Sequence, residues 1–436
     1  MLKRLSLCAA LLLLSVLSAS ADVAINETNF PDSAFRSWIT ANIPNSGGVI
    51  AKATIDTVTT INCSSKGVAD LNGIVFFTAL KKLDCSINKL TALDMSGNVG
   101  LTDLDCYRNN IKSLNVRVNP LLTHLYCYRN PLDSLDVSRN IALIELVCSS
   151  CGLTSLNLRA DTALIYLSCS RNNLKTLDLS ANIKLMDLEC NENYGLQSLD
   201  LSANVALVSL DCNYMKLSTL DLKNITELSS LSCSGNNLTS LDISSNVKLK
   251  SLSCASNQLK KLDTSKNTLL KSLYCSNNNI IAFDFSNNAD LNYFLCNDDS
   301  LTVNVPAAGR KYDLTQLASC GFNATKASNW TGGSVDGTTL TFTNNVVSYD
   351  YDCGKNMSAN IKLVGNFVTG VDGIDNSGLR VVASGGAINI LGADGVVRVY
   401  GAEGRLVYAG TNRTISVPAG LYIVKTGGRT FKVLVM

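Results

Sequence analysis

The chain has 436 residues, of which 46% are hydrophobic and 17% are charged, with 37 basic and 35 acidic side chains. A formal net charge of +2 argues against a nucleic-acid-binding protein that relies on an overall basic surface. A single histidine leaves little for histidine-based acid–base chemistry or a histidine-rich metal site. The sixteen cysteines alone do not distinguish a disulfide scaffold from a metal protein or another role.

Residues 1–21 have the pattern of a secretory signal peptide. Lys3 and Arg4 precede an apolar run at residues 5–17, and a small-residue cleavage site ends at Ala21. The run is too short to cross a membrane as a helix, and no later stretch reaches the length of a spanning helix. Cleavage would leave basic and acidic residues equal in number. We therefore expect export through the inner membrane and no membrane span in the mature chain.

An N-terminal helical cap is predicted over residues 22–57. Pro31 suits the first position of a helix, and Phe35, Trp38 and Ile39 form one apolar face of that helix. Such a cap covers the open apolar end of a stack of repeats.

Residues 58–299 are built from a repeat of 21 or 22 residues. Each unit reads L-x-x-L-x-C-x-x-N-x-L and continues x-x-L-D-L-S-x-N, which matches the leucine-rich-repeat pattern with Cys at one Leu position. The Leu and Cys of each L-x-C face inward and the residue between them faces outward, so stacked coils form a parallel sheet on the concave face. The cysteines in register are Cys63, Cys85, Cys106, Cys127, Cys148, Cys169, Cys190, Cys212, Cys233, Cys254, Cys275 and Cys296.

These cysteines permit three interpretations. A metal site needs ligands that converge on one point, which a linear ladder does not provide. A disulfide needs Cβ atoms about 3.8 Å apart, whereas neighbouring strands lie about 4.8 Å apart with parallel side chains. Buried free thiols that act as small apolar side chains are the interpretation we favour.

An asparagine follows most of these cysteines by three residues, and we expect its side chain to satisfy buried backbone groups of the turn. Cys151 occupies this position in one coil, and Met215 in another, where we expect a local distortion. The asparagines are Asn88, Asn109, Asn130, Asn172, Asn193, Asn236, Asn257 and Asn278.

The second half of the unit carries a further polar row. It is either a cation-binding stripe or a convex-side strand whose Asp residues hydrogen-bond neighbouring Ser and backbone groups. Calcium requires oxygens that wrap around it, and a flat stack does not wrap, so we favour the strand. The row comprises Asp94, Asn115, Asp136, Asn157, Asp178, Asp200, Asp221, Asp242, Asp263 and Asp284.

The run of 21-residue repeats with one Cys each resembles the internalin J type of leucine-rich repeat found in bacterial surface proteins. The resemblance covers about residues 58–299 and implies a ligand-binding surface without naming the ligand. Caps of related proteins often continue with an Asp-rich loop that resembles a calcium-binding loop. Residues 43–55 contain no carboxylate, so we expect no calcium there, and no metal or cofactor elsewhere.

Residues 300–365 contain β-rich pieces and are predicted to form a C-terminal cap or small β module. Cys320 and Cys353 are an isolated pair there and a candidate disulfide.

Residues 370–436 contain short alternating strands separated by turns, as in a β-sandwich. Three segments carry a resemblance to the type A C-terminal sorting domain of the type IX secretion system: VRVYGAEGRLVYAG (397–410), PAGLYIVK (418–425) and KVLV (432–435). The resemblance implies interaction with that secretion machinery and export across the outer membrane. Removal of the domain and then attachment to the cell surface or release would follow.

Counting outward positions from each Cys predicts a recognition patch on the early coils, whereas the later coils present mostly Ser. Tyr and Arg dominate binding hot spots, although the same rings could merely stack along the sheet for stability. The patch comprises Tyr107, Arg108, His124, Tyr126, Tyr128, Arg129, Tyr166 and Arg171, with Glu145 beside them.

The sequence thus predicts an α/β-type leucine-rich-repeat solenoid, made mostly of short parallel β coils with little helix, with an N-terminal helical cap and followed by all-β C-terminal modules. No nucleophilic triad or phosphate-binding loop occurs, so no enzymatic activity is expected. The favoured function is a secreted or surface-attached bacterial protein that binds a host or bacterial surface protein, in adhesion or biofilm formation. The alternatives are a glycan-binding surface protein and a passive structural coat component.

Overall fold

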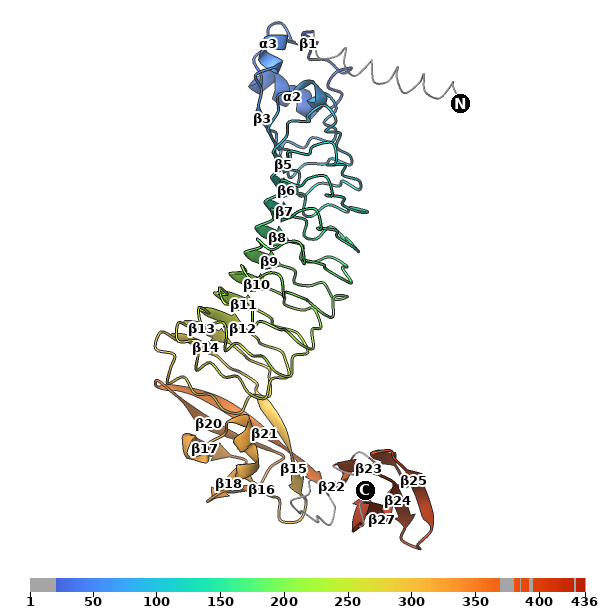
Figure 1. The fold of residues 1–436 in the computed structure, drawn as a ribbon, viewed down its shortest axis with the longest axis vertical. Coiled ribbons are helices and arrows are strands. Elements are labelled where there is room, and N and C mark those ends of the chain that lie inside the picture. Colours follow the sequence, from blue (N-terminus) through green and yellow to red (C-terminus); the bar gives the residue numbers. More distant parts are fainter. Residues whose placement is uncertain (1–20, 369–379, 385, 392–394, 427–428, 436) are drawn as a thin grey trace. The chain divides into compact units, whose positions relative to one another are not determined.

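In the computed structural model (Figure 1), the chain forms two compact units, and each is described by itself below. The first unit comprises the chain through Gln258 with Asp263–Cys275 and Asn287–Leu295, and the second comprises Leu259–Leu262, Ser276–Ser286 and the chain from Cys296. The residues described are 21–368, 380–384, 386–391, 395–426 and 429–435. The predicted signal peptide therefore lies outside the described residues except for Ala21, as do the first ten residues of the predicted 370–436 module.

The N-terminal cap is formed by a short helix, α2 (Ser33–Asn42), with α3 (Lys52–Ile55) and the antiparallel pair β1 (Val23–Ala24) and β2 (Val49–Ile50). Helix α2 begins two residues after Pro31, so the prediction that Pro31 is its first residue is wrong. Asp32 is the N-cap instead, because one carboxylate oxygen accepts from the Phe35 N–H (2.8 Å) and the other from the Ala69 N–H (2.8 Å). Asp32 thereby ties the cap to the first repeat.

The repeats form a parallel sheet of twelve three-residue strands, each paired with its neighbours in sequence (Figure 1). Leucines pair with leucines across the sheet, as Leu104 does with Leu125, and they are buried while their flanking residues remain half-exposed. A single 3-10 turn, Ile74–Phe76, interrupts the first coil. This arrangement confirms the predicted solenoid. The strands are β3 (Thr60–Asn62), β4 (Lys82–Asp84), β5 (Asp103–Asp105), β6 (His124–Tyr126), β7 (Glu145–Val147), β8 (Tyr166–Ser168), β9 (Asp187–Glu189), β10 (Ser209–Asp211), β11 (Ser230–Ser232), β12 (Ser251–Ser253), β13 (Ser272–Tyr274) and β14 (Tyr293–Leu295).

Each cysteine of the ladder directly follows a strand, and all twelve are buried free thiols. Burial raises the pKa values of the ladder cysteines from Cys63 to Cys233, to about 12 for Cys63 and Cys169, because a thiolate loses its hydration in the apolar interior. These side chains are therefore neutral and pack as small apolar groups.

The first asparagine ladder closes the turn of the preceding coil. Asn172 shows the pattern: its Nδ2 donates to the carbonyl oxygens of Cys148 and Cys169 (both 2.9 Å), and its Oδ1 accepts from the N–H groups of Cys151 (3.1 Å) and Leu153 (3.0 Å). Met215 has no such oxygen, and in the coil before it the Leu196 N–H bonds to the Asn193 carbonyl instead (3.0 Å). The distortion at Met215 is thus a local rearrangement of turn hydrogen bonds.

A second asparagine ladder, which the sequence analysis did not identify, runs along the other half of the coils. Asn140 is typical: its Nδ2 donates to the carbonyl oxygens of Val116 (2.9 Å) and Asn119 (2.8 Å), while its Oδ1 has no partner among the described residues. The position therefore favours a hydrogen-bond donor, although the buried Ile225 fills it in one coil. Its asparagines are Asn98, Asn119, Asn140, Asn182, Asn204, Asn246, Asn267 and Asn288.

Asp161 occupies this donor position in one coil. It is 0% exposed, and neither carboxyl oxygen has a hydrogen-bond partner within the described part of the chain. Burial raises its pKa from 3.8 to about 7. A protonated Asp161 can donate to a carbonyl oxygen as the asparagines do, whereas the carboxylate cannot.

We predict that Asp161 makes stability depend on pH. Because its pKa is higher in the folded than in the unfolded chain, the free energy of unfolding falls as pH rises from about 4 to about 7. Asp161→Asn restores the donor and should raise the free energy of unfolding at neutral pH by about 1–3 kcal/mol, measured by urea denaturation. The exposed Asp242→Asn is the control. Equal pH dependence in Asp161→Asn and wild type would contradict the prediction.

The row of Asp residues predicted in the second half of the repeat unit stabilises turns. Asp94 Oδ1 accepts from the Ser96 N–H (2.9 Å), and Asp178 Oδ1 accepts from the Ser180 N–H (3.1 Å). The bonding to neighbouring residues is as expected, but the expected convex-side strand is wrong, because the described coils contain only isolated bridges there. No group of three or more potential metal ligands occurs among the described residues.

The second unit contains two β modules, of which the first follows the repeats. Its sheets have the orders β15-β21-β20-β17 and β16-β19-β18. Tyr349 is buried at its centre, donates to the Ile281 carbonyl (2.9 Å) and stacks on Trp330, with ring centroids 4.5 Å apart. The elements are β15 (Ser300–Pro306), β16 (Lys311–Asp313), a 3-10 helix (Leu314–Cys320), a second 3-10 turn (Ala324–Lys326), β17 (Ala327–Thr331), β18 (Gly333–Asp336), β19 (Thr339–Phe342), β20 (Val346–Gly354) and β21 (Met357–Val368).

Cys320 and Cys353 do not form the candidate disulfide in this structure. Both are free thiols, with Cys353 buried and Cys320 half-exposed. The Cys353 thiol donates to the Tyr351 carbonyl (3.4 Å).

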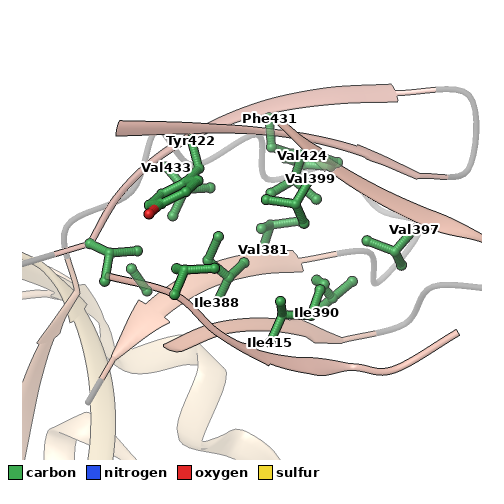
Figure 2. Close-up of a cluster of buried hydrophobic side chains, with 13 residues drawn as sticks. Val381, Ile388, Ile390, Val397, Val399, Ile415, Tyr422, Val424, Phe431 and Val433 are labelled. Carbon is green, nitrogen blue, oxygen red and sulfur yellow. The ribbon is translucent and has the colours of Figure 1, made fainter. Parts of the chain in front are cut away.

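The last module consists of two antiparallel sheets, β22-β23-β26 and β25-β24-β27-β28. Alternate residues of the strands, such as Ile388, Ile390, Val397 and Val399, share one apolar core, and Figure 2 shows their side chains gathered between the strands. The strands are β22 (Arg380–Ser384), β23 (Ala387–Leu391), β24 (Val397–Gly401), β25 (Leu406–Gly410), β26 (Thr414–Ser416), β27 (Gly420–Thr426) and β28 (Arg429–Val435).

Candidate functional site

The candidate site is the concave surface of strands β5–β8. Each strand presents two outward side chains, and the second residue after each cysteine turns the chain with a positive φ, as Arg108, Arg129 and Arg171 do at 55–56°. Few residues other than glycine and asparagine adopt this conformation readily. The three arginines are exposed, and neither Arg108 nor Arg129 forms an ion pair within the described ranges, whereas Arg171 pairs with Glu192 (2.8 Å).

Two predicted patch residues, Tyr107 and Tyr128, stack face to face between adjacent coils. Their ring centroids are 4.4 Å apart and their planes differ by 3°. The stack stabilises the sheet locally, as the alternative interpretation of these rings expects. Both rings remain half-exposed, so they also form an aromatic surface available to a ligand.

His124 and Tyr126 belong to a polar network that crosses β5–β7. His124 Nδ1 lies 2.9 Å from the Thr123 hydroxyl and 3.5 Å from the Asp103 carboxylate. The Tyr126 hydroxyl donates to the Glu145 carboxylate. Burial and this hydrogen bond raise the pKa of Tyr126, so it stays a neutral donor. The network holds both rings in fixed orientations before any partner binds, so the surface is preorganised.

Carboxylates are a further component of the surface. The pKa of Asp105 is raised to about 6, mainly by burial and further by the charge of Asp84, against the lowering effect of the Tyr107 N–H. Burial likewise raises the pKa values of Asp187 and Asp211. Of these carboxylates, only Glu145 is predicted beside the recognition patch, although the alternation of inward and outward residues in each L-x-C segment also places the other carboxylates on the concave surface. The carboxylates on β4–β10 are Asp84, Asp103, Asp105, Glu145, Asp187, Glu189 and Asp211.

Tyr166 is the last patch aromatic on β8. Burial and the neighbouring Glu189 raise its pKa to about 12. β9 and β10 then present mainly carboxylates, and on β11 and β12 the outward residues are Ser, whose hydroxyls pair with each other, as Ser251 does with Ser272 (3.0 Å) and Ser234 with Ser253 (2.8 Å). A second tyrosine pair, Tyr274 and Tyr293, follows on β13 and β14 with ring centroids 4.8 Å apart. The structure thus places a serine segment between the aromatic and charged surface of the early coils and this terminal pair.

Nucleophilic catalysis is not supported at the one His–Cys pair close in sequence. Cys127 is fully buried and its thiol pKa is raised, while His124 lies on the concave surface. A neutral, inaccessible thiol is a poor nucleophile.

Comparison with known proteins identifies the class of fold. No protein-family model matches the chain. Internalin J of Listeria monocytogenes serotype 4b (strain F2365) is 36% identical over 70 residues, which are 16% of this chain and 8% of that protein. The chain therefore matches only a small fraction of that relative's length.

Two solved structures share the architecture. The functional domain of InlJ from Listeria monocytogenes, described as including a cysteine ladder, has a TM-score of 0.52 at 25% identity and covers 80% of this chain and 100% of that one. The internalin InlF from Listeria monocytogenes str. 4b F2365 has a TM-score of 0.54 at 20% identity, with coverage of 63% and 92%. The second likeness concerns the fold alone.

The fold and its exposed concave sheet define a leucine-rich-repeat solenoid with a cysteine ladder. Within that class the chain is similar to internalin J. None of the helices in the described residues is long and apolar enough to cross a membrane.

Proposed function

We propose that this chain is a secreted or surface-attached bacterial protein that binds a host or bacterial surface protein through the concave surface of β5–β8. One observation carries the proposal: tyrosines and exposed arginines are concentrated on and directly after these strands, whereas β11 and β12 present paired serines. Tyr and Arg are the residue types that dominate binding hot spots, and Ser is under-represented there. Adhesion, host interaction and biofilm formation are all consistent with such a surface.

The charges of the surface favour a partner with complementary groups. Arg108 and Arg129 suit acidic side chains, and the carboxylates Asp103, Asp105 and Glu145 suit lysines or arginines. Charge pairs at a polar rim mainly affect the association rate and are screened by salt. The aromatic rings would then supply most of the affinity.

The combined variant Tyr126→Ala and Arg129→Ala tests the surface. It should abolish capture of the partner from surface-labelled host or bacterial cells and leave the thermal midpoint nearly unchanged, because both side chains lie outside the apolar core. Ser251→Ala with Ser253→Ala, in the serine segment, is the matched control and should retain capture. Unchanged capture by the Tyr126/Arg129 variant would refute the site.

Glycan binding is a second candidate function, favoured by a groove in the first β module of the second unit. The groove encloses about 470 Å³ and is lined mainly by polar side chains from β17, β20 and β21. Asp350 is held there by the amide groups of Asn329 (2.9 Å) and Asn360 (2.8 Å), which lower its pKa. A carboxylate fixed in this way can accept hydrogen bonds from sugar hydroxyls.

A glycan array separates the two functions. Binding to defined glycans that Asp350→Ala removes and the Tyr126/Arg129 variant retains would support the groove as a sugar site. Glycan binding that Asp350→Ala leaves intact would exclude the groove. A chain that captures neither glycans nor surface proteins favours a passive coat component.

Export to the cell surface or medium is the remaining part of the proposal, with residues 370–436 engaging the type IX secretion machinery. The compact two-sheet module with its own apolar core supports this assignment (Figure 2). Deleting residues 370–436 should leave the remaining chain inside the outer membrane, where protease added to intact cells cannot reach it. Equal protease sensitivity with and without these residues would refute the sorting role.

A further inference from the structure

Cys151 differs from the other repeat cysteines because it occupies an asparagine-ladder position. Elsewhere an asparagine Oδ1 accepts the N–H group of a leucine or isoleucine in the preceding coil, as for Ile111 and Leu153. In the coil before Cys151 that group, the Leu132 N–H, bonds to the Asn130 carbonyl instead (2.9 Å). Cys151 therefore reproduces only the donor half of the asparagine's role: its thiol donates to the Cys127 carbonyl as an amide would, but it provides no acceptor for the Leu132 N–H.

The geometry places the Cys151 sulfur beside Cys127 of the preceding coil. The Cys151 thiol donates to the Cys127 carbonyl oxygen at 3.3 Å. The equivalent pair of positions three coils further on, Cys190 and Met215, has its two sulfur atoms 3.6 Å apart. A side chain at the ladder position thus reaches the cysteine sulfur of the coil before it.

The electrostatics of the two thiols agree with this contact. The pKa of Cys127 is raised, first by its side-chain hydrogen bond with Cys151 and then by burial. The pKa of Cys151 is lowered, first by that same hydrogen bond and further by the N–H groups of Asn130 and Arg129, against the raising effect of burial. Both shifts arise from the proximity of the two side chains.

We propose that Cys127 and Cys151 form an intramolecular disulfide when the chain folds in an oxidising environment. While the coils are still open, the thiolate of one of the two cysteines attacks one sulfur of a small-molecule disulfide such as oxidised glutathione and releases one thiolate, leaving a mixed disulfide on that cysteine. The thiolate of the other cysteine then attacks the protein sulfur of the mixed disulfide and releases the second thiolate. Two electrons and the two thiol protons pass to the oxidant, which is reduced to two thiols.

The pair is restricted to one place in the repeats. In the other described coils the ladder position holds Asn, Lys66, Met215 or Asp299, and cysteines of adjacent coils stand in register with parallel side chains, which disfavours disulfide geometry. Cys127 is 0% and Cys151 is 1% exposed. The bond must therefore form before the coils close, and reductants would reach it only after they open.

The test uses the full chain refolded from denaturant in oxidised and reduced glutathione, so its outcome depends on neither export nor the binding function proposed above. Free thiols are then alkylated in denaturant without reductant, and trypsin separates the Cys127 peptide (118–129) from the Cys151 peptide (140–159). Mass spectrometry should find these two peptides linked, with two fewer alkylated cysteines than in a reduced sample. Fragmentation should place the bond on Cys151 and not on Cys148.

Two variants complete the test. Cys151→Asn restores the usual ladder residue and should fold with every repeat cysteine alkylated, whereas Cys148→Ala should keep the link. Reduction should lower the denaturation midpoint of the wild type and leave that of Cys151→Asn unchanged. Full alkylation of Cys127 and Cys151 in the refolded wild type, or a link that persists in Cys151→Asn, would overturn the proposal.

Discussion

The solenoid depends on one constraint: every coil turns its backbone into the interior, and the polar groups exposed there must be satisfied without water. Two rows of asparagine side chains meet this constraint, one beside the strands and one in the opposite half of each coil. Because each amide bridges two coils, the same hydrogen bonds that satisfy the turns also fix the spacing of the stack. The cysteines and leucines then fill the space that this spacing leaves.

Departures from the asparagine pattern are therefore chemically informative. Met215 supplies no acceptor, and the preceding turn bonds to itself. As a carboxylate, Asp161 supplies only acceptors where the asparagines supply a donor, so the folded chain favours its protonated form. Cys151 exchanges an amide for a thiol that donates to the Cys127 carbonyl but accepts no backbone N–H of that coil. Because the stack is regular, the hydrogen bonds of each substituted coil can be compared directly with those of neighbouring coils that keep the asparagine.

Sequence periodicity was sufficient to predict the sheet, the inward Leu and Cys residues and the first asparagine ladder, because backbone hydrogen bonding imposes the same requirement on every coil. It was insufficient where two neighbouring residues could each determine the start of a helix. Asp32 replaced Pro31 as the determinant of the helix start because its carboxylate has two sets of partners. The second ladder and the concave carboxylates were visible in the repeat, but their burial and mutual electrostatics depend on contacts between residues about twenty positions apart.

The binding surface was predicted in outline for the same reason. The alternation of the strands identifies which residues face outward, and thus locates Tyr107, Tyr126 and Tyr128. It does not reveal that Tyr107 and Tyr128 stack, or that Tyr126 is tied to Glu145. Those contacts decide how rigid the surface is, and rigidity affects the entropy that a partner loses on binding.

The first asparagine ladder also has a direction. Each amide oxygen accepts N–H groups of the coil before it, so a coil is completed only when the next one has been made. During synthesis the growing end would always carry one unfinished turn, and the arrival of the next asparagine would close it. The stack is thus suited to assembly in the order of translation. Removing coils from the C-terminal side takes away the asparagine oxygens that accept N–H groups of the last remaining coil, whereas removing coils from the N-terminal side leaves the acceptors of the remaining coils in place.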